Sequence, residues 1–262
     1  EVVRLIGEVV VVAPDKEQSG MGHAITMNAP LQLTKRPSSN SNAQKTPTSQ
    51  QDQPTGNKTA SHQQGKGGGA VFTSSGTTGS ILSKHSVPDL ALYEESFRKG
   101  FEYFYGNIRD YCILALLPSY AKSSSLVYMM NDLIKQSEHP DSGFYTDNHI
   151  ELIEKLIVSG KKKQKVLLFR VSFALIDFIE QHASSLQNLG GLIVMETGGT
   201  KGRRKEMVRE ELHKMLCNKF EVDNIHSEYG MTELLSQAYS KGNGLFYSPP
   251  WMKVLIRDIN DH

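Results

Sequence analysis

Short apolar runs alternate with longer amphipathic stretches over most of the chain after residue 70. Apolar runs of this length and richness in branched residues are typical of buried strands. They occupy residues 112–117, 165–169, 192–195 and 252–256. Apolar residues recur at helical spacing in residues 88–106, 123–135, 147–158, 172–182 and 202–217. Strands that alternate with helices predict an α/β fold with a mostly parallel sheet and helices on both faces.

Residues at the ends of these stretches indicate where the helices begin and end. Pro88 suits the first turn of a helix, and Gly106 suits a C-cap. Asp147 and Ser172 are expected N-caps because their side chains accept hydrogen bonds from the first turn. Ser172 also follows a strand, as a nucleophile elbow would, but the flanking glycines of that motif are absent.

The chain before residue 71 differs from the rest in its composition and hydrophobic pattern. Residues 8–14, EVVVVAP, predict a buried strand that ends at a proline. Residues 35–70 are rich in Ser, Gln and Gly and hold almost no apolar side chains, so we expect a disordered linker. The expected division is a short strand-containing fragment at 1–34, the linker at 35–70, and one α/β domain at 71–262.

Composition changes this picture little. Hydrophobic residues make up 38% of the 262 residues, which is low for a fully globular chain. The expected linker explains this low share, because it holds almost no apolar side chains. The formal net charge of +1 predicts no nucleic-acid partner. Two cysteines give no disulfide framework, and the sequence contains no membrane-span-length apolar run and no secretory leader pattern. These features predict a soluble, cytoplasmic protein.

The run VFTSSGTTGS at residues 71–80 is the first candidate ligand-binding motif. Two apolar residues that end a strand lead into glycines and hydroxyls, and a strong helical pattern follows. Backbone N–H groups and hydroxyls in such a turn can surround a phosphate. The run is not a Walker A loop, because that motif's Gly-Lys-Ser/Thr ending is absent. A solvated surface turn is the alternative.

SSGTTG, followed far downstream by YGMTE at residues 229–233, resembles the signature pair of adenylate-forming enzymes. Segments such as YEESFRKGFEYFYGNI and METGGTKGRRKEMVREELH resemble the acyl-protein synthetase (LuxE-type acyltransferase) branch over residues 71–262. The resemblance implies the fold of the N-terminal domain of adenylate-forming enzymes. It also implies ATP- and Mg²⁺-dependent activation of a carboxylic acid, expected to be fatty, and acyl transfer to a thiol or an acceptor protein.

The same resemblance assigns roles to individual residues. Tyr229 would pack against adenine, Thr232 would contact the α-phosphate as a catalytic residue, and Glu233 would hold Mg²⁺. The remaining nucleotide-binding residues implied are Ser75, Gly76, Thr77, Thr78, Gly79, Gly198, Gly199 and Gly230. The alternative is that Tyr229 belongs to the core and Glu233 is a surface charge.

Two departures from this pattern limit the expected turnover. The family often has a lysine three residues after the last glycine of the first motif, where this chain has Leu82; Lys84 is the nearest lysine. The chain stops at RDINDH, before the lid that carries a catalytic lysine in that superfamily. We therefore expect nucleotide binding with weak turnover.

Residues 1–34 resemble a fragment of the survival-protein (SurE) 5′-nucleotidases, on the segment APDKEQSGMGHAITMNAPLQL. The resemblance places Ser19 at a metal-site serine. The family's paired aspartates are missing, and one hydroxyl cannot hold a divalent metal, so we expect this segment to be catalytically silent. Two alternatives to the acyltransferase follow: a 5′-nucleotidase or phosphatase, and a catalytically incomplete nucleotide-binding module.

Overall fold

The structure is a computed structural model that describes residues 6–11, 24–26, 69–74, 82–182, 186, 189–198 and 208–257. Of these, residues 6–11, 24–26, 173 and 254–257 are described by their backbone alone. Most of the predicted linker lies outside the described residues.

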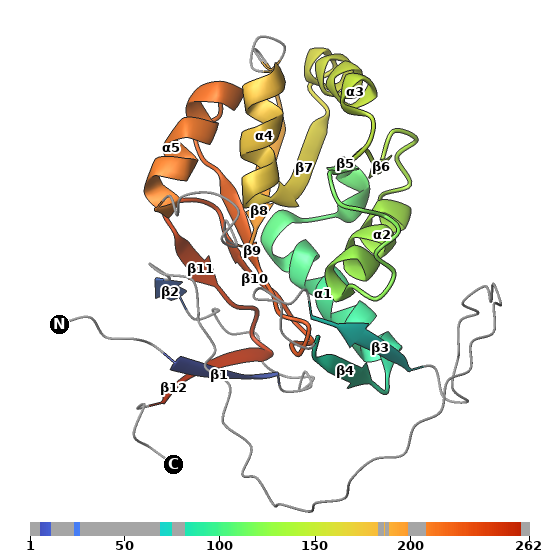
Figure 1. The fold of residues 1–262 in the computed structure, drawn as a ribbon, viewed down its shortest axis with the longest axis vertical. Helices are drawn as coiled ribbons and strands as arrows, with labels where there is room; N and C mark the ends of the chain where they lie inside the picture. Colours follow the sequence, from blue (N-terminus) through green and yellow to red (C-terminus); the bar gives the residue numbers. More distant parts are fainter. Residues whose placement is uncertain are drawn as a thin grey trace, which may run out of the picture.

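Within the described residues, eight strands form one sheet in the order β2-β11-β10-β9-β8-β7-β5-β6 (Figure 1). In chain order they are β2 (Ala24–Thr26), β5 (Tyr111–Ala115), β6 (Gly143–Phe144), β7 (Lys165–Val171), β8 (Leu192–Thr197), β9 (His226–Tyr229), β10 (Ala238–Ser240) and β11 (Leu245–Tyr247). β6, β5, β7, β8 and β9 are parallel neighbours, whereas β10, β11 and β2 join the sheet antiparallel. The predicted mostly parallel α/β sheet is confirmed.

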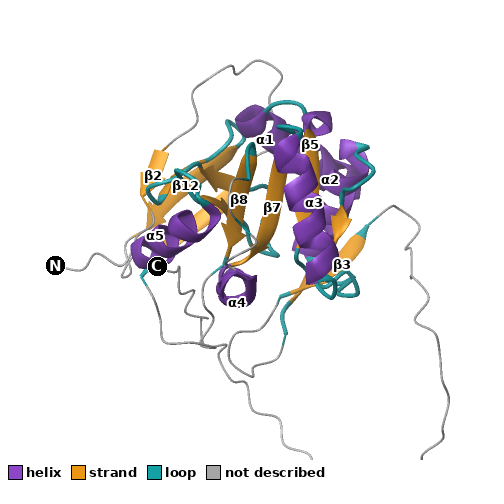
Figure 2. Ribbon diagram, turned by 90° about the horizontal axis from the view of Figure 1, so that it is seen from above, coloured by secondary structure: helices purple, strands orange, loops and turns teal. Residues whose placement is uncertain are grey.

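Helices cover both faces of this sheet, and Figure 2 shows α1 and α4 on opposite sides of it. One face carries α1 (Leu90–Tyr105), the 3₁₀ turn η1 (Ile108–Asp110) and α2 (Ser125–Ser137). The other carries α3 (His149–Lys161), α4 (Ser172–His182) and α5 (Arg209–Phe220). Successive side chains of a strand point to opposite faces, so the wholly buried β5 supplies Ile113 to the first core and Cys112 and Leu114 to the second.

The start of α1 lies slightly later than predicted. Asp89 is the N-cap, and its carboxylate accepts the backbone N–H groups of Ala91 and Leu92. Pro88 therefore precedes the cap, so its predicted place in the first turn is wrong. Gly106 is the C-cap, as predicted, with a φ of 82° that favours glycine.

The N-cap of α3 is Asn148, so the prediction of Asp147 is wrong. The Asn148 side chain accepts the backbone N–H of Glu151 at 3.1 Å. A side chain of this length satisfies the N–H three residues ahead, so the capping position falls one residue later. Ser172 is the first residue of α4 rather than its N-cap.

The Ser/Gly/Thr run lies between two antiparallel strands, not between a strand and a helix as predicted. β3 (Ala70–Thr73) and β4 (Lys84–Val87) form a separate two-stranded sheet, with Ala70 paired to Val87. Among the residues of β3 and β4, Phe72 and Val87 are fully buried, against the core beside α1. The KHSV sequence of β4 lacks an apolar alternation, which is why its pattern predicted no strand.

The strands near the start of the chain pair with strands near its end. β1 (Ile6–Val11) pairs antiparallel with β12 (Met252–Arg257) over six residue pairs, and β2 pairs with β11. In Figure 1 the blue and red strands accordingly lie side by side. Backbone pairing therefore connects the nucleotidase-like segment to the last part of the α/β unit.

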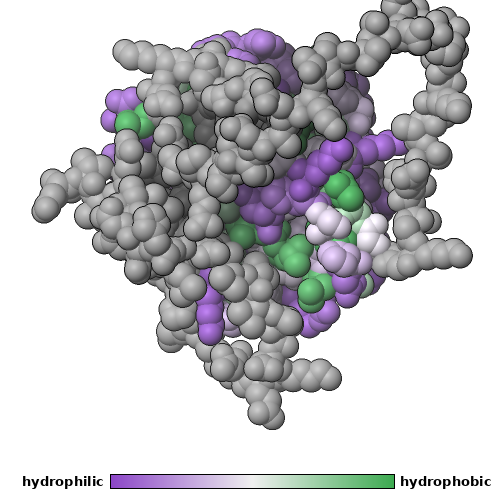
Figure 3. Space-filling view, turned by 60° about the horizontal axis from the view of Figure 1, so that its bottom comes forward, coloured by the Kyte–Doolittle hydropathy of each residue, from purple (hydrophilic) through white to green (hydrophobic). Residues whose placement is uncertain are grey.

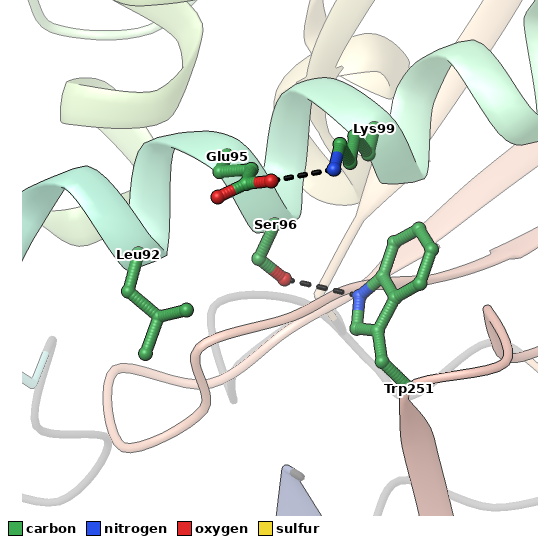
Figure 4. Close-up of a pocket in the computed structure, with 5 residues that line it drawn as sticks. All are labelled: Leu92, Glu95, Ser96, Lys99 and Trp251. Carbon is green, nitrogen blue, oxygen red and sulfur yellow. Dashed lines mark hydrogen bonds and ion pairs between the residues drawn. The ribbon is translucent and has the colours of Figure 1, made fainter. Parts of the chain in front are cut away.

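Trp251 joins the turn before β12 to α1. Its indole N–H lies 3.1 Å from the hydroxyls of both Ser96 and Ser236. Figure 4 shows the small pocket that Trp251 lines with residues of α1. Its volume of about 10 Å³ is at the lower limit for one water molecule, so this pocket cannot hold a nucleotide.

Some apolar side chains of the hairpin face solvent. Val71 and Leu82 are 55% and 51% exposed. Figure 3 shows apolar and hydrophilic side chains next to one another on the lower face of the molecule in the orientation of Figure 1. Isolated exposed apolar residues of this kind are normal for protein surfaces.

Two glycines with positive φ allow a test of the turn before β8. Gly191 has a φ of 76°, and an added Cβ would lie 2.6 Å from the Gln164 carbonyl oxygen. Gly244 has a φ of 66° and nothing within 4 Å of such a Cβ. Gly244→Ala should cost about 1–2 kcal/mol of unfolding free energy from backbone strain alone. Gly191→Ala should cost at least about 1 kcal/mol more because of the clash.

Urea unfolding of the two variants measures both effects. Equal losses of unfolding free energy would contradict the close approach of Gly191 to Gln164.

Candidate functional site

A buried carboxylate lies at the carboxyl end of the parallel strands. Glu196, near the end of β8, is 1% exposed. Its Oε2 lies 2.5 Å from the hydroxyl of Ser172, which follows β7, and its Oε1 accepts a 2.6 Å hydrogen bond from Ser227 of β9. The Ser172 hydroxyl also lies 2.7 Å from the carbonyl oxygen of Gly198. Hydroxyls from the start of α4 and from β9 therefore satisfy this carboxylate.

Two side chains of α5, Arg209 and His213, complete the surroundings of Glu196. His213 Nε2 lies 3.4 Å and Arg209 Nε 3.8 Å from Glu196 Oε1. Burial alone would raise the pKa of Glu196, but the hydrogen bond to His213, the charge of Arg209 and the two serine hydroxyls together lower it. Glu196 is therefore ionised at neutral pH.

A second carboxylate, Glu228 of β9, lies on the opposite face of the sheet. Glu196 is paired in register with Ser227, and Thr197 with Glu228, and register partners share a face. The Thr197 hydroxyl lies 2.5 Å from Glu228 Oε2. The pKa of Glu228 is raised to about 7. Burial is the largest cause, the charge of Glu196 adds to it, and the hydrogen bond from Thr197 partly opposes it. Glu228 can therefore hold a proton near neutral pH.

This arrangement excludes a nucleophilic triad built on Ser172. A triad needs the imidazole between the serine and the carboxylate. Here Glu196 lies between the other two groups, with its Oε2 2.5 Å from the Ser172 hydroxyl and its Oε1 3.4 Å from His213 Nε2, so the order of groups is not that of a triad. The cluster instead joins α4, β8, β9 and α5 at the edge where α/β sheets bind ligands.

The structure brings two predicted nucleotide-binding residues together at this edge. Gly198 directly follows β8 and Tyr229 ends β9, one position beyond the Thr197–Glu228 pair. Gly198 has a φ of 71°. The Tyr229 ring packs 6.2 Å from Phe246, and its hydroxyl is buried without a hydrogen-bond partner. Tyr229 thus belongs partly to a small apolar cluster, as the alternative interpretation expected.

The two predicted motifs also approach each other through their neighbours. Glu233 Oε2 lies 3.8 Å from His85 Nε2 of β4, which lies 3.1 Å from the Ser83 hydroxyl. Ser83 in turn donates a 2.7 Å hydrogen bond to the hydroxyl of Ser74, where the Ser/Gly/Thr run begins. Thr232 is half-buried, and Gly230 and Glu233 are exposed.

The other predicted site residues lie outside the described part of the chain. They are Ser19, Ser75, Gly76, Thr77, Thr78, Gly79 and Gly199. Their assigned roles remain predictions.

The sequence interpretation missed Glu196, Glu228 and Arg209. A signal was present: the runs METG and SEYG each place a glutamate two residues before a glycine, near the end of a strand. Adjacent parallel strands with this pattern bring the two glutamates to one edge of the sheet.

Comparison with known proteins concerns the start of the chain. Residues 1–65 match the family described as survival protein SurE. A 5′-nucleotidase SurE of Pelobacter propionicus is 58% identical over 31 residues, 12% of this chain and 13% of that protein. Those of Geobacter sulfurreducens and Flavobacterium johnsoniae are 56% and 68% identical over 34 residues, 13% of each chain. The chain thus spans about an eighth of the length of these relatives.

These matches correct the predicted function. The matched family and relatives are 5′-nucleotidases, so the predicted acyl-protein synthetase, with ATP-dependent formation of an acyl-adenylate and acyl transfer, is wrong. The SurE resemblance is confirmed. It extends to residue 65, beyond the predicted boundary at residue 34.

In the described part of the chain, no helix combines the length and apolar character needed to cross a membrane.

Glu228 makes stability depend on pH. Its pKa rises from an ordinary 4.5 in the unfolded chain to about 7 in the folded protein. As pH rises from about 4.5 to 7, the unfolded chain loses this proton first, so the folded state should lose up to about 3 kcal/mol. Glu228→Gln keeps an acceptor for Thr197 and cannot ionise, so its unfolding free energy should change less over this range.

Urea unfolding between pH 4.5 and 8 measures the effect. Glu210→Gln on α5 leaves Glu228 in place and should retain the wild-type slope. A Glu228→Gln variant with that same slope would contradict the assignment.

Proposed function

We propose that this protein removes phosphate from nucleoside monophosphates, the reaction class that the name 5′-nucleotidase gives to its relatives. The observation that carries the proposal is the match of residues 1–65 to the SurE family, with runs of 31–34 residues that are 56–68% identical to named 5′-nucleotidases.

Strand pairing supports a role for this segment within the folded unit. Residue 11, at the end of β1, pairs with Met252, and residue 24, at the start of β2, pairs with Tyr247. The two described residues that flank the Ser19 segment in the sequence are therefore both paired with C-terminal strands. The same strands adjoin the Tyr229–Phe246 contact at the sheet edge.

The described residues do not provide a metal site for this reaction. They contain no group of three or more His, Cys, Asp or Glu side chains that could hold a metal ion. A divalent cation needs several oxygen ligands, so Glu233 alone does not suffice. We therefore assign no step to a metal held by the described residues. The phosphatase proposal replaces the expectation that residues 1–34 are catalytically silent, and phosphate release decides between the two.

Phosphate release tests the proposal. The purified chain should release phosphate from AMP in the presence of Mg²⁺ or Mn²⁺. Ser19→Ala should reduce the rate by at least about tenfold if that hydroxyl belongs to the site, a loss comparable to removing an outer-shell partner of a metal. Ser86→Ala, on the exposed side of β4, is the matched control and should keep the wild-type rate. No release above the blank in any metal would refute the phosphatase.

A second candidate function is nucleotide binding without turnover. It is supported by the contacts that connect Glu233, through His85 and Ser83, to Ser74 at the start of the Ser/Gly/Thr run. A single carboxylate suits a Mg²⁺ ion that is held mainly by nucleotide phosphates. This candidate retains the predicted roles of the two motifs in holding Mg·ATP and does not include an acyl substrate.

Glu233→Gln should weaken Mg·ATP binding by about 10–100-fold, because it removes the charge and keeps the shape. Thr77→Val should weaken it less, since one neutral hydrogen bond contributes about 0.5–1.5 kcal/mol. Glu102→Gln, on the exposed side of α1, serves as the control. Calorimetric titration measures all four proteins. Wild-type affinity in Glu233→Gln would reject the Mg·ATP role of YGMTE, whatever the outcome of the phosphate assay.

A further inference from the structure

Two histidines meet where the start of α3 lies against the end of α4. His149 is the first residue of α3, and His182 is the last residue of α4. Nδ1 of His149 lies 3.4 Å from Nε2 of His182. The ring centroids are 5.4 Å apart, so these two nitrogens occupy the facing edges of the rings. Both residues are half-buried, and neither belongs to the Glu196 cluster or to a predicted motif.

Packing against a buried aromatic ring holds both imidazoles in place. Phe178, which is fully buried, precedes His182 by four residues on α4, and residues four apart share a helix face. The Phe178 ring lies 5.2 Å from each imidazole, edge-on to that of His149 and tilted against that of His182. The three rings form a closed triangle, so the packing of the rings sets the positions of the two nitrogens.

The separation of these nitrogens distinguishes two interpretations of the pair. A hydrogen bond from a protein N–H group usually spans about 2.7–3.2 Å, so 3.4 Å is long for a proton shared between the rings. Nitrogen ligands at about 2.0–2.1 Å from a tetrahedral Zn²⁺ ion lie about 3.3–3.4 Å from each other. The observed separation therefore matches that of two ligands on one ion.

We propose that His149 and His182 bind a divalent transition-metal ion of the Zn²⁺ and Cu²⁺ class. Imidazole nitrogen suits these ions, whereas Mg²⁺ and Ca²⁺ prefer oxygen ligands. Within the described part of the chain no group of three or more His, Cys, Asp or Glu side chains could hold a metal, so the remaining coordination positions fall to water. A bound ion connects the start of α3 to the end of α4.

This site is independent of the proposed phosphatase, and no step of that reaction is assigned to its ion. Two protein ligands predict a weaker site than the three or four of catalytic and structural zinc sites. Cu²⁺ should bind more tightly than Zn²⁺, following the usual order of affinities for nitrogen ligands.

The test is calorimetric titration of the full chain, first freed of metal with EDTA, with CuCl₂ and with ZnCl₂. Both ions should bind and should raise the melting temperature, because a ligand of the folded state stabilises that state. MgCl₂ at the same concentration should not raise it. The electron paramagnetic resonance spectrum of the Cu²⁺ complex should show hyperfine coupling to imidazole nitrogen.

His149→Gln and His182→Gln each remove one ligand. Either change should weaken Cu²⁺ binding by at least about tenfold, since loss of even an outer-shell partner has an effect of this size. His182 ends its helix and is half-buried, so His182→Gln should fold and decides the matter if His149→Gln does not.

His139→Gln is the matched control. His139 is also half-buried, and its Nδ1 accepts the backbone N–H of Asp141 rather than facing a second imidazole. This variant should keep the wild-type affinity for Cu²⁺.

Unchanged melting of wild type in Zn²⁺ and in Cu²⁺ would overturn the proposal and leave a hydrogen bond between the rings. A His182→Gln variant with wild-type Cu²⁺ affinity and an unchanged resonance spectrum would overturn it as well, because the ion would then bind elsewhere in the chain.

Discussion

The buried carboxylate of Glu196 holds the ligand edge of the sheet together. It accepts hydrogen bonds from the hydroxyls of Ser172 at the start of α4 and Ser227 of β9, and it faces Arg209 and His213 of α5. A buried charge with this many partners is tolerated, whereas one that loses a partner typically costs about 3–5 kcal/mol. Four elements are thereby fixed relative to one another, and Gly198 and Tyr229 take their positions from β8 and β9.

The parallel pairing of β8 with β9 also separates two acidic groups. Glu196 faces the α4–α5 side, where hydrogen bonds from His213 and two serines and the charge of Arg209 lower its pKa. Glu228 faces the α1 side, where burial raises its pKa to about 7. Environments that move two pKa values apart are common where proteins use proton transfer. Here both groups are almost wholly enclosed, so they organise the edge rather than offer an open site.

Satisfied and unsatisfied polar groups occur a few residues apart on the same face. At Glu196 both carboxylate oxygens accept hydrogen bonds, but Nη1 of the neighbouring Arg209 is buried without a partner, as are Nε and Nη1 of Arg170, the residue paired in register with Glu196. Short motifs were a poor guide to function in this chain. SSGTTG and YGMTE suggested an acyltransferase, whereas runs of 31–34 residues are 56–68% identical to proteins named 5′-nucleotidases.

The sequence by itself determined the α/β class, the central strands and most of the helices. Apolar runs such as that of β5, and the helical spacing of α1, are local patterns that burial on both faces of a sheet imposes. It also determined the nucleotidase-like start of the chain, because identity over about thirty residues is itself local information. Tertiary structure decided the rest. It paired β1 with β12 and β3 with β4, and it brought Ser172, Glu196 and Ser227 together. These contacts join residues that are separated in the sequence. No periodicity encodes such contacts, since they depend on strand order and register.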